Sequence, residues 1–270
     1  MRALALALAL LLAGGPAAAQ EIALSPAPVQ GGLVVGRAPP GSAVTLDGRK
    51  VTTTAEGEFV LGFGRDATRA TLEIAPPGGR RETRTLEIGR RKFDIQRVDG
   101  LPQAKVTPDQ EGLRRIREDN AAVAAVRVRD TAETWYRSGW IWPAVGPISG
   151  VYGSQRILNG EPRAPHWGVD VAMPVGTPVV APADGTVSLV QPDNFLTGMT
   201  LLIDHGYGLS TVYAHLSAID VAAGERVARG QRIGAVGATG RVTGAHLHWG
   251  LTWFDVRLDP ALLVPPMPGG

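Results

Sequence analysis

Residues 246–253 read His-Leu-His-Trp-Gly-Leu-Thr-Trp, and the fold of the second half of the chain is read outward from this stretch. Its aromatic residues and its alternation are typical of a β-strand. Side chains two positions apart on a strand share a face, so His246 and His248 point toward one site. The stretch therefore predicts a strand that carries two imidazoles on a single face.

All five histidines of the chain lie between residues 166 and 248. His166 precedes Asp170 by four residues, a spacing that brings the two side chains together on a strand or on a helix. Val169 and Val171 favour a strand or an extended loop here. Two imidazoles and one carboxylate suit Zn²⁺ and leave a fourth position for water. Either motif alone is weak evidence, whereas the two together predict a metal site.

The amino-acid composition limits which fold classes and which kinds of functional site are possible. Among 270 residues there are 35 glycines and 21 prolines, which favours a turn-rich β architecture over a helical bundle. The absence of cysteine excludes disulfides, iron–sulfur clusters, cysteine nucleophiles and Cys-ligated zinc, so any metal must use His, Asp or Glu. A net charge of +2 is not the footprint of a nucleic-acid-binding protein.

Residues 1–19 have the pattern of an export signal. Arg2 gives a positive start, residues 3–13 form an apolar run, and three alanines at 17–19 form a small-residue cleavage site. The run is shorter than the roughly 20 apolar residues that span a bilayer, and no later stretch is long enough either. We therefore expect an exported chain without stable membrane insertion.

The rest of the chain divides into two β-rich regions joined by a helix. Short alternating runs separated by turn residues predict a small β-sandwich-like domain over residues 20–98. Residues 99–134 form a linker that contains a helix over 107–133, with Thr107 as the cap residue, and we expect it to lie against one of the domains. Residues 135–270 form a second domain of short β-branched runs and tight glycine turns. The predicted fold class is all-β.

Seven stretches of the second domain resemble the LytM/lysostaphin-type zinc metallopeptidases, which cut peptide cross-links in bacterial cell walls. In the order of that family they are residues 150–156, 159–162, 166–170, 176–185, 213–216, 230–234 and 239–248. The resemblance implies zinc ligands at His166, Asp170 and His248. It also implies catalytic roles for His215 and His246, which act on the attacking water and on the tetrahedral intermediate.

The resemblance implies a peptidase whose substrate is peptidoglycan. With the export signal it points, by analogy, to a periplasmic enzyme that cuts D-Ala–diaminopimelate bonds. Two alternatives stay open: a non-enzymatic regulator of wall hydrolases, and a latent enzyme whose groove is covered by the helix or by the first β domain. A regulatory protein partner and the oligomeric state are also left open. We expect His205 to be structural or to support a site residue rather than to be catalytic. We expect Trp167 and Trp249 to pack in the core or to line a groove wall.

Overall fold

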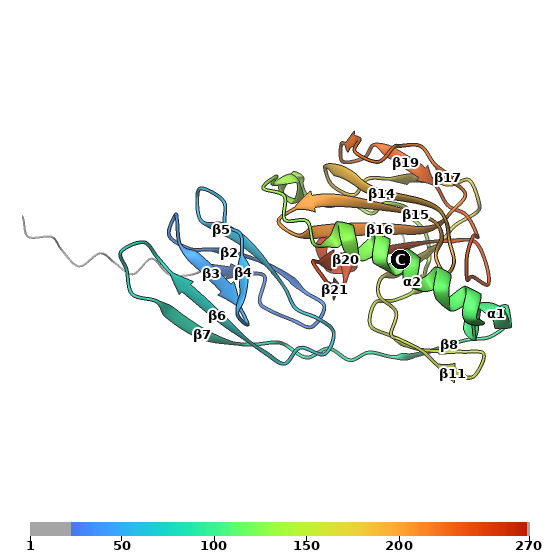
Figure 1. Ribbon diagram of the computed structural model, residues 1–270, viewed down its shortest axis with the longest axis horizontal. Coiled ribbons are helices and arrows are strands. Elements are labelled where there is room, and N and C mark those ends of the chain that lie inside the picture. Colours follow the sequence, from blue (N-terminus) through green and yellow to red (C-terminus); the bar gives the residue numbers. More distant parts are fainter. Residues whose placement is uncertain (1–22, 269–270) are drawn as a thin grey trace, which may run out of the picture.

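The computed structural model describes residues 23–268, which form two lobes (Figure 1). The expected export signal at residues 1–19 lies outside the described residues. The predicted all-β class is confirmed, because strands dominate both lobes and the helices are few and short. No helix among the described residues is long and apolar enough to cross a membrane.

The N-terminal lobe consists of two small antiparallel sheets. Residues 69–75 of the second sheet alternate between buried and more exposed positions, residues 59–62 of the first sheet are buried in succession, and the buried side chains of both sheets share one hydrophobic cluster. The first sheet has the order β1 (Ala23–Ser25), β2 (Leu33–Arg37) and β5 (Glu58–Gly62). The second has the order β4 (Arg49–Val51), β3 (Ala43–Leu46), β6 (Arg69–Ala75) and β7 (Glu82–Glu87).

The C-terminal lobe is built on an eight-stranded sheet. Its order is β18 (Arg226–Val227), β14 (Gly185–Asn194), β15 (Gly198–Gly206), β16 (Leu209–Leu216), β20 (His246–Trp253), β12 (Val169–Ala172) and β9 (Ile148–Gly150), and β21 (Val256–Leu258) also pairs with β20. A smaller sheet contains β13 (Pro178–Val180), β19 (Arg232–Ala235) and β17 (Ala218–Ile219). The central strands β15 and β16 are buried along their length.

The segment between the lobes is part of the C-terminal lobe. Strand β8 (Ile95–Val98) pairs in parallel with β10 (Gln155–Leu158), which also pairs with β11 (Glu161–Pro162). A short helix α1 (Gln103–Val106) follows, and then α2 (Gln110–Arg127), which crosses in front of the large sheet (Figure 1). The remaining helical turns are η1 (Trp135–Ser138) and η2 (Pro260–Leu263).

Helix α2 is shorter than the helix predicted over 107–133, and it has a different cap. Thr107 ends α1, and the carboxylate of Asp109 accepts a hydrogen bond from the Gly112 N–H at 2.8 Å. Asp109 is therefore the N-cap, and Pro108 precedes the helix. Aspartate and threonine are both favourable N-cap residues, so the residue types at 107 and 109 do not by themselves show which of the two is the cap.

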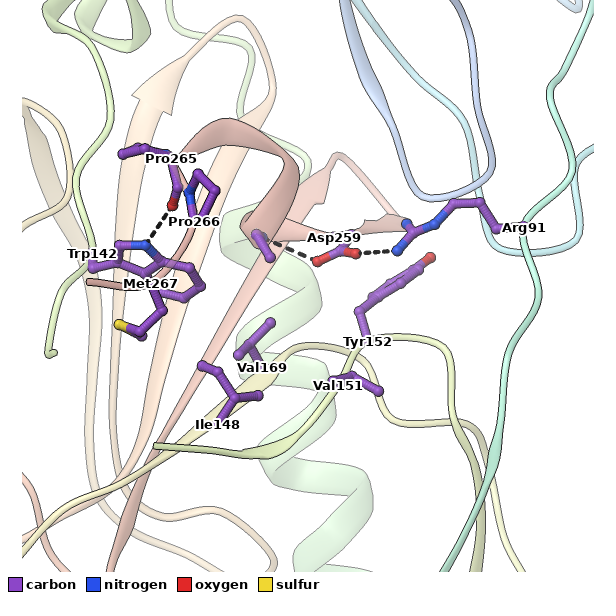
Figure 2. A pocket seen from close by; sticks show the side chains of 11 residues that line it. Arg91, Trp142, Ile148, Val151, Tyr152, Val169, Asp259, Pro265, Pro266 and Met267 are labelled. Carbon is purple, nitrogen blue, oxygen red and sulfur yellow. Dashed lines mark hydrogen bonds and ion pairs between the residues drawn. The ribbon is translucent and has the colours of Figure 1, made fainter. Parts of the chain in front are cut away.

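The two lobes share a hydrophobic core. Trp253 and Leu258 from the large sheet belong to the same buried cluster as Phe59 and Leu61 of β5. Beside this junction lies a cavity of about 300 Å³, at whose edge Arg91 forms a 2.7 Å ion pair with Asp259 (Figure 2). None of the five histidines lines this cavity.

Candidate metal centre and catalytic groove

Strand pairing brings the predicted metal ligands together. Asp170 on β12 lies directly opposite His248 on β20, so the two side chains share one face of the sheet. Asp170 Oδ1 is 2.8 Å from His248 Nδ1 and 3.0 Å from His166 Nε2. The two imidazole nitrogens are 2.9 Å apart. Three potential ligand atoms therefore converge on one point, as the sequence predicted from the spacing of the two motifs.

The groups around these three side chains fix their orientation. His166 Nδ1 donates to the carbonyl of Val151 at 3.0 Å, which leaves a lone pair on Nε2. Arg156 Nη2 donates to Asp170 Oδ2 at 2.6 Å, so the carboxylate turns its other oxygen toward the imidazoles. Gly150 makes room for this carboxylate, because a Cβ at that position would lie 2.4 Å from Asp170 Oδ2.

Burial and charge set the protonation of the cluster. Burial alone would raise the pKa of Asp170, but hydrogen bonds and charge from His166 and His248 outweigh it and hold the pKa well below its usual value. Burial lowers the pKa of His248 to about 4. At neutral pH the aspartate is therefore ionised and His248 is neutral, which are the protonation states that a metal ligand requires.

These residues fit a zinc ion on the chemistry of the donor set. A ligating imidazole must be neutral, and the carbonyl of Val151 accepts the Nδ1 proton of His166, so at most one proton then lies among the three converging atoms. Ligands held by a tetrahedral zinc at about 2.0 Å stand roughly 3.3 Å from one another, close to the separations of 2.8–3.0 Å found here. A cation at this point would satisfy lone pairs that the protein alone leaves facing one another.

His215 and His246 lie beside the three converging residues. The ring of His215 is 4.7 Å from that of His246 and 6.2 Å from that of His248, measured between ring centroids. His215 Nδ1 donates to the carbonyl of Thr239 at 2.8 Å, and His246 Nδ1 donates to the carbonyl of Gly244 at 2.9 Å. Each ring therefore carries its lone pair on Nε2, which none of these backbone contacts uses.

A strained backbone turns His215 toward the site. Ala214 pairs with His248 across β16 and β20, so regular alternation would place the next residue on the opposite face. Between Tyr213 and Leu216 the pairing with β15 gains one extra residue, which is a β-bulge, and His215 has a φ of 63°. The left-handed conformation is costly for a histidine, and such strain in a folded protein accompanies functional sites.

His166, His215 and His248 line a groove of about 450 Å³. One of its walls is helix α2, which contributes Ile116, Asp119 and Val123 among others. Trp167 lines the groove, whereas Trp249 is completely buried in the core on the other face of β20. Of the two positions expected for these residues, Trp167 therefore takes the groove wall and Trp249 takes the core.

His205 has a structural position, as expected. It is fully buried and makes two hydrogen bonds, from Nδ1 to the Asp184 carbonyl at 2.7 Å and between Nε2 and the Thr211 hydroxyl at 2.8 Å. Burial lowers its pKa to about 4. Both ring nitrogens are used by the protein, so none is left for a ligand.

Sequence reasoning assigned no role to several groups at the site. Arg156 lies in one of the stretches that carry the family resemblance, but nothing in its spacing shows that it reaches Asp170. The carbonyls of Val151, Thr239 and Gly244 leave no signal in a sequence at all. Arginine in a motif that contains no acidic partner could have been flagged as a candidate partner of a buried carboxylate.

Comparison with known proteins agrees with this geometry. Residues 164–260, which include every residue of the cluster, match peptidase family M23. A crystal structure from Pseudomonas aeruginosa assigned to peptidase M23 is 32% identical, covers 87% of this chain and 94% of that one, and superposes with a TM-score of 0.67. The chain belongs to peptidase family M23.

Curated relatives match this M23 chain over shorter spans. Peptidoglycan DD-endopeptidase ShyA of Vibrio cholerae is 51% identical over 88 residues, which are 33% of this chain and 20% of ShyA. The cell division protein DipM of Caulobacter vibrioides is 30% identical over 166 residues, which are 59% of this chain and 26% of DipM. The chain therefore spans only about a fifth to a quarter of the length of these two relatives.

Proposed function

We propose that this chain is an exported zinc metallo-endopeptidase that hydrolyses peptide cross-links of peptidoglycan, with the D-Ala–diaminopimelate bond as its target. The observation that carries the proposal is the convergence of His166 Nε2, Asp170 Oδ1 and His248 Nδ1 beside two further imidazoles. The name of ShyA supports the substrate. The leader pattern at residues 1–19 supports export, which for a wall enzyme of this kind favours the periplasm.

His166, Asp170 and His248 would hold the zinc. When bound, zinc supplies Lewis-acid chemistry, which lowers the pKa of water and polarises a peptide carbonyl. Arg156 holds the ligand carboxylate in place through its second oxygen, and Val151 holds His166 in the tautomer that a ligand needs. Such outer contacts tune metal affinity as well as geometry.

His215 and His246 would carry the proton transfers. Hydrolysis adds water to the carbonyl carbon and breaks the C–N bond, and one water proton passes to the leaving amine. The backbone carbonyls of Thr239 and Gly244 hold both Nδ1 protons, so each Nε2 can accept a proton or, once protonated, hydrogen-bond to a developing oxyanion. Burial, with a smaller effect from His246 and His248, lowers the pKa of His215 to about 3, so this ring is neutral at neutral pH.

The proposed peptidase domain is residues 135–270, and the proposed β-sandwich-like domain is residues 20–98, with the linker at 99–134. Strand β8, at the end of the proposed first domain, joins a sheet of the C-terminal lobe, and helix α2 of the linker forms a wall of the groove. The substrate would lie extended between this wall and the face of β20.

A second candidate is a latent enzyme, or a regulator that uses the groove for docking. The position of α2 along the groove favours it. Arg115 and Asp119 hold α2 through ion-pair and backbone hydrogen bonds to Asp193 and Phe195. The variant Arg115→Gln/Asp119→Asn should loosen the helix. If α2 keeps the enzyme latent, this variant should be more active than the unaltered chain; if α2 is part of the working groove, the variant should be less active.

The main test uses purified residues 20–270 and isolated diaminopimelate-type sacculi, with and without a zinc chelator. Mass spectrometry of the muropeptides then reports the cross-links. We expect dimers to be converted to monomers only without chelator, and the new termini identify the bond. Intact dimers under both conditions would contradict the enzymatic proposal and leave the regulator, with the Arg115→Gln/Asp119→Asn variant as the test of latency.

A further inference from the structure

Two arginines of the groove have neither an acidic partner nor a side-chain hydrogen bond to the protein among the described residues. Arg127 is the last residue of α2, Arg257 lies on β21, and both line the groove. Among residues 23–268, neither forms an ion pair, and the Nε of Arg127 is buried without a hydrogen-bond partner. Both side chains are half-buried, and guanidinium groups withdrawn from water are normally paired with carboxylates or phosphates, so this pair requires an explanation.

The other arginines of the groove have partners. Arg156 bonds to Asp170, and Arg163 forms an ion pair with Glu161. Arg241 forms no ion pair but donates to the carbonyl of Lys105 at 3.3 Å. The groove also contains Asp119, but its carboxylate accepts a hydrogen bond from the Phe195 N–H at 2.7 Å. The acidic groups of the groove are therefore engaged elsewhere, and Arg127 and Arg257 are left with one another.

The two unpaired guanidinium groups repel each other. Burial, with a smaller effect from the positive charge of Arg257, lowers the pKa of Arg127 to about 9. Burial lowers the pKa of Arg257 as well. Both side chains nevertheless keep their charge at neutral pH, so this end of the groove combines two desolvated positive charges. An anion placed between them would relieve both the desolvation and the repulsion.

The strand register places this positive end at a defined distance from the metal cluster. On the groove face of β20, His248 is followed by Gly250 and Thr252, and Thr252 pairs with Arg257. Four residues of a strand span roughly 13 Å. Trp167 and Val212 line the groove in the same region. An extended peptide bound at His248 therefore reaches the arginines two to four residues from the bond at the metal cluster.

We propose that Arg127 and Arg257 form a subsite for a carboxylate of the peptide substrate, two to four residues from the bond that is cleaved. The proposal rests on the proposed function and specifies its substrate class as peptides with a free carboxylate, rather than amidated peptides or oligoglycine. The guanidinium fork matches a carboxylate through two parallel hydrogen bonds. An amide in its place offers only one acceptor oxygen, and its NH2 group would face the N–H donors of the arginines.

The test compares two synthetic cross-linked stem peptides that differ only in free or amidated carboxylates. With the zinc-loaded full chain, we expect kcat/KM to favour the free-carboxylate peptide by at least about tenfold, as expected for hydrogen bonds to a charged group. In Arg127→Gln/Arg257→Gln this ratio should fall toward one. Arg80→Gln/Arg90→Gln is the matched control, because it removes two exposed arginines of the N-terminal lobe and should keep the ratio.

An equal kcat/KM for the two peptides in the unaltered chain would overturn the subsite and leave the proposed function standing. If neither peptide is cleaved, the proposed function fails, and isothermal titration of the uncut free-carboxylate peptide then decides on the subsite. A tenfold loss of affinity in the double variant supports it, and unchanged affinity overturns it. If the double variant fails to fold, Arg257→Lys is used instead. It keeps the positive charge but loses the paired N–H donors of the guanidinium, so the ratio of kcat/KM values should fall to a value between that of the unaltered chain and one.

Discussion

Two buried regions of the large sheet combine histidine and aspartate, and only one of them is built as a site. In the first, Asp170 meets His166 and His248. In the second, Asp204 and His205 lie next to each other at the end of β15, both buried. The amino-acid types are the same, and both regions lie on strands of one sheet.

The difference lies in where the hydrogen bonds go. Asp204 accepts from the Gly206 N–H at 2.9 Å and from the Thr131 hydroxyl at 3.0 Å, and His205 uses both ring nitrogens on other protein groups. Burial raises the pKa of Asp204, whereas the imidazoles around Asp170 lower the pKa of that carboxyl. A candidate site is thus marked by potential ligand atoms that converge on one point, and burial alone does not mark it.

The largest effect is expected when the converging carboxylate is removed. Asp170→Ala should lose bound zinc and reduce activity by more than about 10³-fold, because the Lewis-acid contribution amounts to several kcal/mol. Zinc content by mass spectrometry and turnover of cross-linked peptide measure the two losses. Asp204→Asn is the control from the second region and should retain zinc. Zinc loss in Asp204→Asn, or retention in Asp170→Ala, would break the comparison.

The proposed proton-transfer residues should separate turnover from metal binding. His246→Ala and His215→Ala should each keep stoichiometric zinc and lose about 10²–10⁴-fold in kcat, the usual contribution of a positioned acid or base. The measurement pairs zinc analysis with steady-state kinetics on the same preparation. A zinc-free His246→Ala protein would show that the ligand set has been assigned incorrectly.

A smaller effect is expected from the arginine that orients the ligand carboxylate. Arg156→Gln should weaken zinc binding by about 10–100-fold, the range typical of contacts to a metal ligand. Competition with a chromogenic chelator gives the affinity. Arg163→Gln is the matched control at the same groove, since Arg163 pairs with Glu161 instead of Asp170. Equal affinities in the two variants would remove Arg156 from the site.

The smallest effect on activity is expected at His205, which should affect stability alone. Its pKa is lowered from 6.5 to about 4, so the unfolded state binds the extra proton as the pH falls from about 6.5 to 4. Stability is therefore full above pH 6.5 and falls by roughly 3 kcal/mol toward pH 4 through this group. Urea unfolding at several pH values should show a shallower fall in Asp170→Ala/His205→Gln than in Asp170→Ala.

The zinc-free Asp170→Ala background keeps metal release from contributing to that slope. In zinc-loaded protein, His205→Gln should change kcat by less than about twofold, since stability and catalysis separate when a residue touches no reacting group. An unchanged pH slope together with a large fall in kcat would place His205 with the metal cluster after all.

Much of the site followed from spacing in the sequence. The two-residue period of a strand predicts that His246 and His248 share one face, and both residues lie on strand β20. The four-residue interval brought His166 and Asp170 within 3.0 Å although His166 precedes β12. These predictions succeed because strand geometry is short-range and nearly invariant. The helix boundaries were less accurate, since Thr107 and Asp109 are both good caps and packing around the helix selects one of them.

By itself, the sequence determined the all-β class, the absence of cysteine chemistry and which histidines share a strand face, because these depend on composition and local periodicity. The tertiary structure decided the rest. A bulge turns His215 across the sheet, Arg156 reaches Asp170 from another strand, and α2 brings Arg127 to the groove. Each depends on groups that are distant in the chain or on an irregular backbone, and local periodicity carries no information about either.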